Sequence, residues 1–430
     1  MAIGPGMCYN ELIFLGKAGG TMKAERPYPQ VHITQKGERA LTAGHPWVYA
    51  AEVTELSGPV EDGGLADVIG HKGAYLGTGF YNSHSLIRCR LLSRNANDRF
   101  DDAFWQRRVQ YAWDYRKAVM PPEDLHCCRV IFGEADGFPG LTVDRFGPVL
   151  VVQVLSLGME HIQDQLLPIL AQVLRRDGQD VAGIYLRNDV ALREKEGLTQ
   201  SKGWFPLPGE AQPDLTGANI VENGIRYRVD FINGQKTGFF LDQKYNRQAV
   251  ARLSMGRTVL DCFTHTGSFA LNAARGGAKH VTAVDVSEFA VRCAAENARL
   301  NGLDGVMECR AANVFDLLPE LEKGPKVYDF IILDPPAFTK SRKTIESAMT
   351  GYKEINYRAM KLLPRGGYLA TCSCSHFAST ERFIAMLHSA AKDAGVQLRQ
   401  IEQRQQACDH PILWGVDETD YLKFFLFQVV

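Results

Sequence analysis

The chain has 430 residues, and at about 100–200 residues per domain this length predicts two to four domains. Its hydrophobic content of 45% and charged content of 23% are typical of globular proteins and exclude wholesale disorder or a collagen-like repeat. With 48 Lys and Arg against 49 Asp and Glu, the formal charge is −1, so any nucleic-acid site has to be a local basic patch.

The cysteines and apolar segments indicate a reducing environment and no membrane partner. The 10 cysteines are scattered through the chain and do not form the dense framework of small secreted domains. Near the N-terminus the short apolar stretch at 12–15 has no basic region before it, which excludes a signal peptide or membrane span. We therefore expect a soluble cytoplasmic protein whose residues 1–28 form a loose extension.

Short apolar runs separated by glycines predict a β-rich unit over residues 29–97. The expected strands lie at 31–33, 66–69, 75–81 and 85–92, with one short helix at 36–43. Small barrels of this kind often present RNA-binding surfaces. The basic residues that we expect to meet phosphates are Lys36, Arg39, Arg88, Arg90 and Arg94.

A mixed α/β unit is expected over residues 98–212. It begins with an amphipathic helix at 100–120, flanked by basic residues. The other elements expected here are strands at 128–132, 141–144, 149–155 and 183–187 and a helix at 162–175.

From residue 213 to 430, apolar runs with the length of buried strands alternate with helical segments. The expected strands are 258–262, 280–284, 329–333 and 367–372, and the expected helices are 268–275, 287–301, 345–362 and 379–394. Strand–helix alternation predicts a parallel, doubly wound sheet that binds ligands at the carboxyl ends of its strands.

The first candidate site is the segment 259–269, VLDCFTHTGSF, in which a buried strand runs through a tight loop into a helix. Gly267 would let the backbone approach a ligand, but the G-x-G-x-x-G fingerprint is absent, which disfavours an NAD-linked oxidoreductase. The next strand ends at Asp285, which can accept ribose hydroxyls, and the third delivers Asn313, which can bond an adenine edge. This order and spacing describe the S-adenosylmethionine pocket of class I methyltransferases.

The fourth strand ends in Asp334-Pro335-Pro336, where two prolines stiffen the turn and fix the direction of the carboxylate. In class I methyltransferases, an acid-Pro-Pro segment grips the amine or ring nitrogen of a planar base. A plain turn is the alternative interpretation.

The fifth strand ends in ATCSCSH at 370–376, and its cysteine pair, Cys372 and Cys374, indicates the reaction. Carbon 5 of a pyrimidine becomes nucleophilic when a thiolate adds at carbon 6, so a cysteine facing the base would allow methyl transfer to carbon 5. A buried structural cysteine is the alternative for either thiol.

Three segments carry a specific resemblance: NGQKTGFFLDQKYNR at 233–247, FGEADGFPGLTVDR at 132–145, and QACDHP at 406–411 together with YLK at 421–423. Together they resemble the RlmI-type family of bacterial 23S rRNA cytosine-5 methyltransferases, and the match covers nearly the whole chain after residue 28.

The resemblance implies an N-terminal PUA-like β-barrel at 29–97, a central α/β domain with a β-hairpin at 98–212, and a Rossmann-like class I methyltransferase domain at 213–430. It places the nucleophile at Cys374, with Cys372 as the fallback on the same strand face. Lys244 stands where the family commonly has arginine, and Ala337 where another group of RNA cytosine-5 enzymes has a cysteine, so the group that removes the carbon 5 proton is open.

The implied cofactor is S-adenosyl-L-methionine, and the implied partner is 23S rRNA or a large-subunit precursor. Asp334 joins the two cysteines as a catalytic candidate. The residues expected to hold the cofactor are Gln243, Asp261, Phe263, Thr264, Gly267, Asp285, Val286, Asn313, Val314 and Asp334.

Several alternatives stay open at this point. A guanine N7 methyltransferase would use a similar catalytic domain without a covalent thiol, and a non-catalytic rRNA-binding assembly factor would keep the pocket as a remnant. We expect no metal, because the clusters at 126–128 and 408–410 lack paired C-x-x-C spacing. A homodimer is compatible with the sequence, which does not determine the oligomeric state or the nucleotide that is modified.

Overall fold

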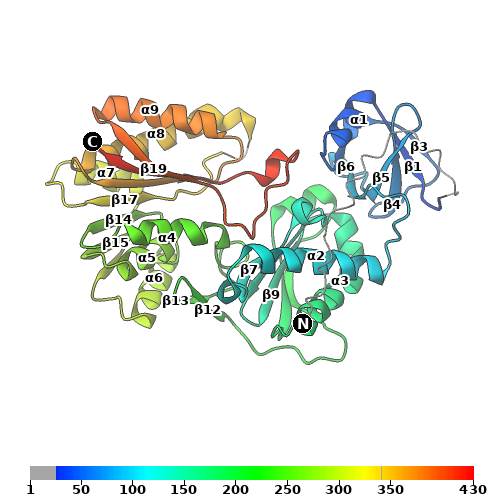
Figure 1. Ribbon diagram of the computed structural model, residues 1–430, viewed down its shortest axis with the longest axis horizontal. Coiled ribbons are helices and arrows are strands. Elements are labelled where there is room, and N and C mark those ends of the chain that lie inside the picture. The colour runs from blue at the N-terminus through cyan, green and yellow to red at the C-terminus, as the bar shows by residue number, and fades with distance from the viewer. Residues whose placement is uncertain (1–25, 340) are drawn as a thin grey trace, which may run out of the picture.

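The structure is a computed structural model that describes residues 26–339 and 341–430. The expected N-terminal extension at 1–28 therefore lies mostly outside the described residues. Figure 1 shows a small β-rich part at one end of the molecule, a seven-stranded sheet at the other, and a second α/β part between them. Among the helices described, none is long and apolar enough to cross a membrane.

The N-terminal part is a six-stranded sheet in the order β2-β6-β5-β4-β1-β3. Its helix α1 begins after Thr34, whose side chain accepts a hydrogen bond from the Gly37 amide. Val31, Leu41 and Val68 are among the fully buried residues of its separate core. Its elements are β1 (Gln30–Ile33), α1 (Gln35–Thr42), β2 (Trp47–Tyr49), β3 (Val53–Ser57), β4 (Leu65–Ile69), β5 (Tyr75–Tyr81) and β6 (Ile87–Ser93).

The middle part is a five-stranded sheet in the order β11-β10-β9-β8-β7, with two helices that bury apolar faces against it. The side chain of Asp101 caps helix α2 by accepting from the Phe104 amide, and Trp105 and Trp113 of that helix are buried. Its elements are α2 (Asp102–Val119), β7 (Cys127–Phe132), β8 (Leu141–Phe146), β9 (Val149–Val154), α3 (Leu157–Arg176), β10 (Gly183–Asn188) and β11 (Ser201–Phe205).

Arg90 joins the first two parts and corrects one sequence-based expectation. It is only 9% exposed, and its guanidinium lies 2.8 Å from a Glu196 carboxylate oxygen and 3.4 Å from one of Glu134. Arg88 likewise donates to backbone carbonyls of its own loop, including that of Ser85. The prediction that Arg90 meets phosphates is wrong, because its charge is buried and paired with carboxylates of the middle part.

The C-terminal part begins with a two-stranded hairpin, β12 (Ala218–Glu222) and β13 (Ile225–Val229), and continues into a seven-stranded sheet. The strand order is β16-β15-β14-β17-β18-β20-β19, in which the first five strands run parallel. The strands are β14 (Thr258–Cys262), β15 (His280–Asp285), β16 (Met307–Ala311), β17 (Phe330–Leu333), β18 (Tyr368–Ser373), β19 (Leu398–Arg404) and β20 (Lys423–Val429).

The observed sheet differs from the expected all-parallel one at strand β20, which lies between β18 and β19 and runs antiparallel to both. The expected strands at 258–262, 280–284, 329–333 and 367–372 are confirmed within a residue or two, whereas β19 and β20 are not among the expected strands.

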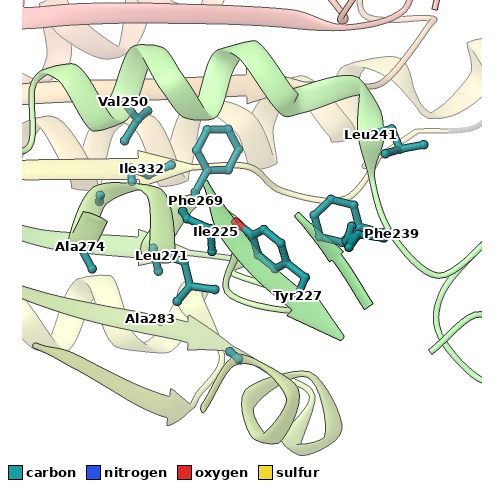
Figure 2. Packing of buried hydrophobic residues seen from close by; sticks show 14 of the residues in the cluster. Ile225, Tyr227, Phe239, Leu241, Val250, Phe269, Leu271, Ala274, Ala283 and Ile332 are labelled. Atoms are coloured by element: carbon teal, nitrogen blue, oxygen red, sulfur yellow. The ribbon is translucent and has the colours of Figure 1, made fainter. Parts of the chain in front are cut away.

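Helices cover both faces of this sheet, and alternate residues of each strand enter different cores (Figure 1). Val259 of β14 belongs to the core that includes residues of α4, α5 and α6, while Leu260 belongs to the core that includes residues of α7, α8 and α9. Figure 2 shows part of the first core, in which Tyr227 and Phe269 extend from different elements into one apolar layer. The helices are α4 (Lys244–Arg252), α5 (Ser268–Arg275), α6 (Glu288–Leu300), α7 (Val314–Leu321), α8 (Ile345–Leu362) and α9 (Thr380–Ala394).

Candidate active site

A cavity of about 450 Å³ opens at the carboxyl ends of β14, β15, β17 and β18. This is where an open α/β sheet binds its ligands, and the volume suits a nucleoside-sized molecule. Its walls are formed by Gln235, Lys236, Phe240, Asp242, Gln243, Arg247, Phe263, Thr264, His265, Ser268, Phe269, Asp285, Val286, Ser287, Ala312, Asn313, Val314, Phe315, Asp334, Pro335, Pro336, Phe338, Cys374 and Leu422.

Two predicted cofactor residues, Asp261 and Gly267, shape the first loop and are not part of the cavity wall. The buried Asp261 carboxylate accepts from the Thr264 hydroxyl at 2.6 Å and from the Ala270 amide at 2.9 Å. These bonds tie the loop to the start of α5. Burial raises the pKa of Asp261 to about 7, because the charged form loses its hydration.

Gly267 has a φ of +83°, a conformation that favours glycine, and an added Cβ would lie 3.0 Å from Ala294 and from Met307. Its open side therefore faces helix α6 and strand β16. The side on which a Cβ would stand is thus filled by protein, and the expectation that a ligand approaches this backbone stays a prediction.

Asp285 presents a carboxylate to the cavity with both oxygens already oriented by the backbone. One oxygen accepts from the His265 amide and the other from the Ser287 amide, each at 2.9 Å. Each oxygen keeps a further lone pair for ligand hydroxyls, and the neighbouring Val286 is 74% exposed as an apolar platform. Such a set fits the ribose and adenine of S-adenosylmethionine.

Asn313 lines the cavity but uses its amide within its own helix. Its side-chain oxygen accepts from the Phe315 amide at 3.1 Å, and its nitrogen donates to Asp316 at 2.9 Å. It therefore caps α7, and its predicted bond to an adenine edge stays a prediction.

Asp334 is held at the cavity wall by Gln243, which donates from Nε2 to Oδ1 at 3.0 Å. Burial and the nearby Asp242 carboxylate raise the pKa of Asp334 to about 6, against the opposing effects of Arg247 and of the Gln243 hydrogen bond. This carboxyl group can therefore exchange a proton close to neutral pH.

The two candidate cysteines occupy different settings. Cys372 lies within β18, is fully buried in the apolar core and is not part of the cavity wall. Cys374 follows the end of β18, lines the cavity, and places its sulfur 4.0 Å from the Pro335 carbonyl oxygen. Burial raises the pKa of the Cys374 thiol to about 11, and the Asp334 carboxylate acts in the same direction.

Sequence reasoning missed several residues of the cavity wall. Lys236, Phe240 and Asp242 lie in the 233–247 segment, which was recognised as a family signature but supplied only Gln243 to the predicted site. His265 lies in the glycine-containing loop; burial lowers its pKa to about 4, so it is neutral at physiological pH. The 233–247 segment precedes the strands of the sheet, so its position in the sequence does not indicate that it lies beside the strand ends.

Metal ligation finds no support in the geometry of the part of the chain that is described. There, no three His, Cys, Asp or Glu side chains come together as a potential metal site.

Two known protein families match this chain and define the class of protein to which it belongs. The family of S-adenosylmethionine-dependent methyltransferases matches residues 204–428, and the PUA-like domain family matches residues 31–94. The protein is thus an S-adenosylmethionine-dependent methyltransferase with an N-terminal PUA-like domain, and its cofactor is S-adenosylmethionine. The predicted boundaries at 97 and 212 stay predictions.

Individual relatives narrow this class. Ribosomal RNA large subunit methyltransferase I of Klebsiella pneumoniae (strain 342) is 38% identical over 94% of this chain and 99% of its own length. The protein of the same name from Cronobacter sakazakii (strain ATCC BAA-894) is 39% identical over 93% of this chain and 99% of its own length. The chain belongs to the ribosomal RNA large subunit methyltransferase I family.

Solved structures agree with the fold. A chain described as a SAM-dependent methyltransferase from Streptococcus mutans has a TM-score of 0.77, and SMU.776, described as a methyltransferase complexed with SAH, has a TM-score of 0.79. Each is 21% identical and covers 93% of this chain and 100% of its own.

Proposed function

We propose that this enzyme methylates carbon 5 of a cytosine in 23S rRNA, or in a precursor of the large subunit, through a covalent bond to Cys374. The observation that carries the proposal is the position of Cys374 in the same cavity wall as Asp334 and Asp285. The names of the relatives support large-subunit rRNA as the substrate, and the PUA-like domain gives the chain a second part for holding RNA.

The proposed chemistry assigns separate tasks to the wall residues. Asp334, fixed by its two prolines and by Gln243, accepts a hydrogen bond from the exocyclic amine or a protonated ring nitrogen of the flipped base. The Cys374 thiolate adds to carbon 6, which makes carbon 5 nucleophilic. When bound, S-adenosylmethionine supplies an electrophilic methyl group on sulfur.

Methyl transfer to carbon 5 is followed by release of the base from Cys374. The electron pair at carbon 5 forms the new bond to the methyl group, and the bond between that methyl group and the donor sulfur breaks, with its electron pair remaining on sulfur as a neutral thioether. A base then removes the carbon 5 proton, the double bond between carbons 5 and 6 re-forms, and the Cys374 sulfur leaves with the electron pair of its bond to carbon 6. The enzyme thereby returns to its starting state with a free thiol.

Cys374 is the proposed nucleophile, and Cys372 is its alternative. Cys372 is fully buried between β17 and β20, and its thiol lies behind the wall residues Gln243 and Asp334, with which it forms hydrogen bonds. Cys374 lines the cavity itself, which favours it as the nucleophile.

The test compares wild type with Cys374→Ala and Cys372→Ala on 23S rRNA, with 5-methylcytosine mapped by bisulfite sequencing. We expect Cys374→Ala to abolish methylation and Cys372→Ala to retain it, while calorimetry shows S-adenosylmethionine binding in both. A covalent complex with 5-fluorocytosine-containing RNA should form in wild type and in Cys372→Ala only.

Three results would contradict the proposal in different ways. Methylation that survives the double replacement of Cys374 and Cys372 would indicate a reaction without a covalent thiol, such as guanine N7 methylation. Loss of activity in Cys372→Ala alone would make Cys372 the nucleophile. Absence of S-adenosylmethionine binding to wild type would favour an assembly factor.

A further inference from the structure

Lys423 is a buried lysine beside the candidate nucleophile that the proposed chemistry does not use. It is the first residue of β20, is only 5% exposed, and pairs across the sheet with Ser373. Its ammonium group donates to the Ser375 carbonyl oxygen at 2.8 Å. The residues it contacts thus lie immediately before and after Cys374.

The positive charge of Lys423 has no close carboxylate partner. Within the described residues, no carboxylate oxygen lies within 4.0 Å of its nitrogen, unlike the buried Lys244, which lies 3.4 Å from Asp124. A buried ammonium group without an anion is costly, so a nearby group that becomes negative is favoured. The Cys374 thiol can supply that negative charge, and Asp420 is the other acidic group whose charge acts on Lys423.

The segment that carries Cys374 is held from a second side. Tyr352 of α8 lies with its hydroxyl oxygen 2.8 Å from that of Ser375, so Ser375 is bonded through both its side chain and its carbonyl. This double attachment limits how the turn after β18 moves, and it keeps the Cys374 sulfur in the cavity wall.

We propose that Lys423 is a positioning residue that fixes the turn after β18 and stabilises the Cys374 thiolate by its charge. This inference rests on the proposed function, because only a covalent route needs the thiolate. Lys423 belongs to the family-like stretch 421–423 but does not line the cavity. The proposal gives this residue a role.

Other charged groups around Cys374 also affect the stability of its thiolate. Asp334 and Asp242 face the sulfur and disfavour its negative form, whereas Lys236 and Lys423 favour it. Tyr352 also faces this group, from α8. Of the two cations, Lys236 has the larger effect on the pKa of the thiol, but it is exposed to water, whereas Lys423 is buried and is bonded to the turn that carries Cys374.

Burial lowers the pKa of Lys423 to about 8, while Cys374 and Asp420 favour its charged form. It is therefore mainly protonated at neutral pH, when a thiolate at Cys374 would need it. As the pH rises through about 8, Lys423 loses its charge and its effect on the thiol disappears.

The test measures the thiol directly, without RNA. Wild type, Lys423→Gln and Lys423→Arg are alkylated with iodoacetamide at a series of pH values, and the rate at Cys374 is followed by peptide mass spectrometry. Cys293, a partly exposed thiol on α6, serves as the internal reference in each sample. Lys326→Met is the matched control, because Lys326 also donates to a backbone carbonyl, that of Leu363, but lies outside the cavity wall.

We expect Lys423→Gln, which keeps a donor but loses the charge, to slow alkylation of Cys374 at neutral pH by roughly tenfold, corresponding to about one pKa unit. Lys423→Arg and Lys326→Met should stay close to the wild-type rate. If Lys423→Gln does not fold, Lys423→Met carries the same expectation. S-adenosylmethionine binding, measured by calorimetry, reports whether each variant is folded.

The proposal would be overturned if the alkylation rate of Cys374 in Lys423→Gln followed the same pH dependence as in wild type. It would also be overturned if Lys423→Gln and Lys423→Arg slowed this alkylation equally. Failure of the proposed function would look different. There, Cys374→Ala would retain methylation, while the alkylation series would still report whether the Lys423 charge acts on the thiol.

Discussion

Gln243 and Asp334 come from segments 91 positions apart, and the Gln243 amide nitrogen lies 3.0 Å from the Asp334 carboxylate. Gln243 in turn accepts from the Asn246 side chain at 2.6 Å, so its amide orientation is fixed within the start of α4. The acid that we propose to bind the base is therefore aligned by the segment that precedes the methyltransferase sheet.

Replacing Gln243 with alanine should move the acid limb of the activity profile to higher pH. The hydrogen bond from Gln243 favours the charged form of Asp334, whose pKa is about 6, so its loss raises that pKa by about one unit. Methylation rates across pH measure the shift. Gln248→Ala, on the exposed side of α4, is the matched control, and an unshifted acid limb in Gln243→Ala would contradict the assignment.

Replacing Asp285 with alanine should weaken S-adenosylmethionine binding by roughly 50- to 100-fold. The reason is the loss of two charge-assisted hydrogen bonds to ligand hydroxyls. Isothermal titration calorimetry measures the affinity. Asp304→Ala, an exposed aspartate after α6, should bind like wild type. Equal affinity in Asp285→Ala would mean that the ribose is held elsewhere.

Gly267→Ala should destabilise the fold more than Gly302→Ala. Both glycines have positive φ, +83° and +65°, so each alanine costs about 1 kcal/mol of backbone strain. Only at Gly267 would the new methyl group crowd Ala294 and Met307, which adds about 1–3 kcal/mol. Chemical denaturation compares the two variants, and equal free energies of unfolding would show that the contact with α6 relaxes without cost.

Asp261→Asn should become increasingly stable relative to wild type as the pH rises. The folded protein holds the Asp261 proton up to a pKa of about 7, whereas the unfolded chain releases it near 3.8. Between these values the folded state binds more protons, so the stability of wild type falls with rising pH. Asparagine removes this dependence.

The difference in the free energy of unfolding between Asp261→Asn and wild type should therefore grow through this window by up to about 4 kcal/mol. Urea denaturation of the cofactor-free protein at several pH values measures it. Asp304→Asn is the exposed control. A constant difference across pH would show that Asp261 is already ionised in the folded protein.

The sequence predicts the parallel part of the fold well, because four of its strands are short, mainly apolar runs that alternate with helical segments. It also identifies Asp285, Asp334 and Cys374, since each lies within two residues of the end of a predicted strand, and the strand ends of such a sheet meet at one edge. These three side chains line one cavity.

What the sequence does not predict depends on contacts between distant segments. Arg90 looks like a phosphate-binding residue until Glu134 and Glu196 are known to surround it. Asp261 and Gly267 share the loop motif of a ligand site, yet their partners are the loop itself and helix α6. Cys372 and Cys374 are alike in the sequence, and only the point where β18 ends separates a core thiol from a cavity thiol.

Strand β20 has a consequence for how the protein is made. β18 pairs with β17 on one side and with β20 on the other, and β20 follows it by a helix, a strand and a long connection. During synthesis, the cysteine-bearing strand therefore stays half-paired until residues 423–429 have left the ribosome. The proposed nucleophile Cys374 and the neighbouring Lys423 are thus brought together only late in folding, and nascent chains that lack residues 423–429 are expected to leave the turn after β18 unorganised.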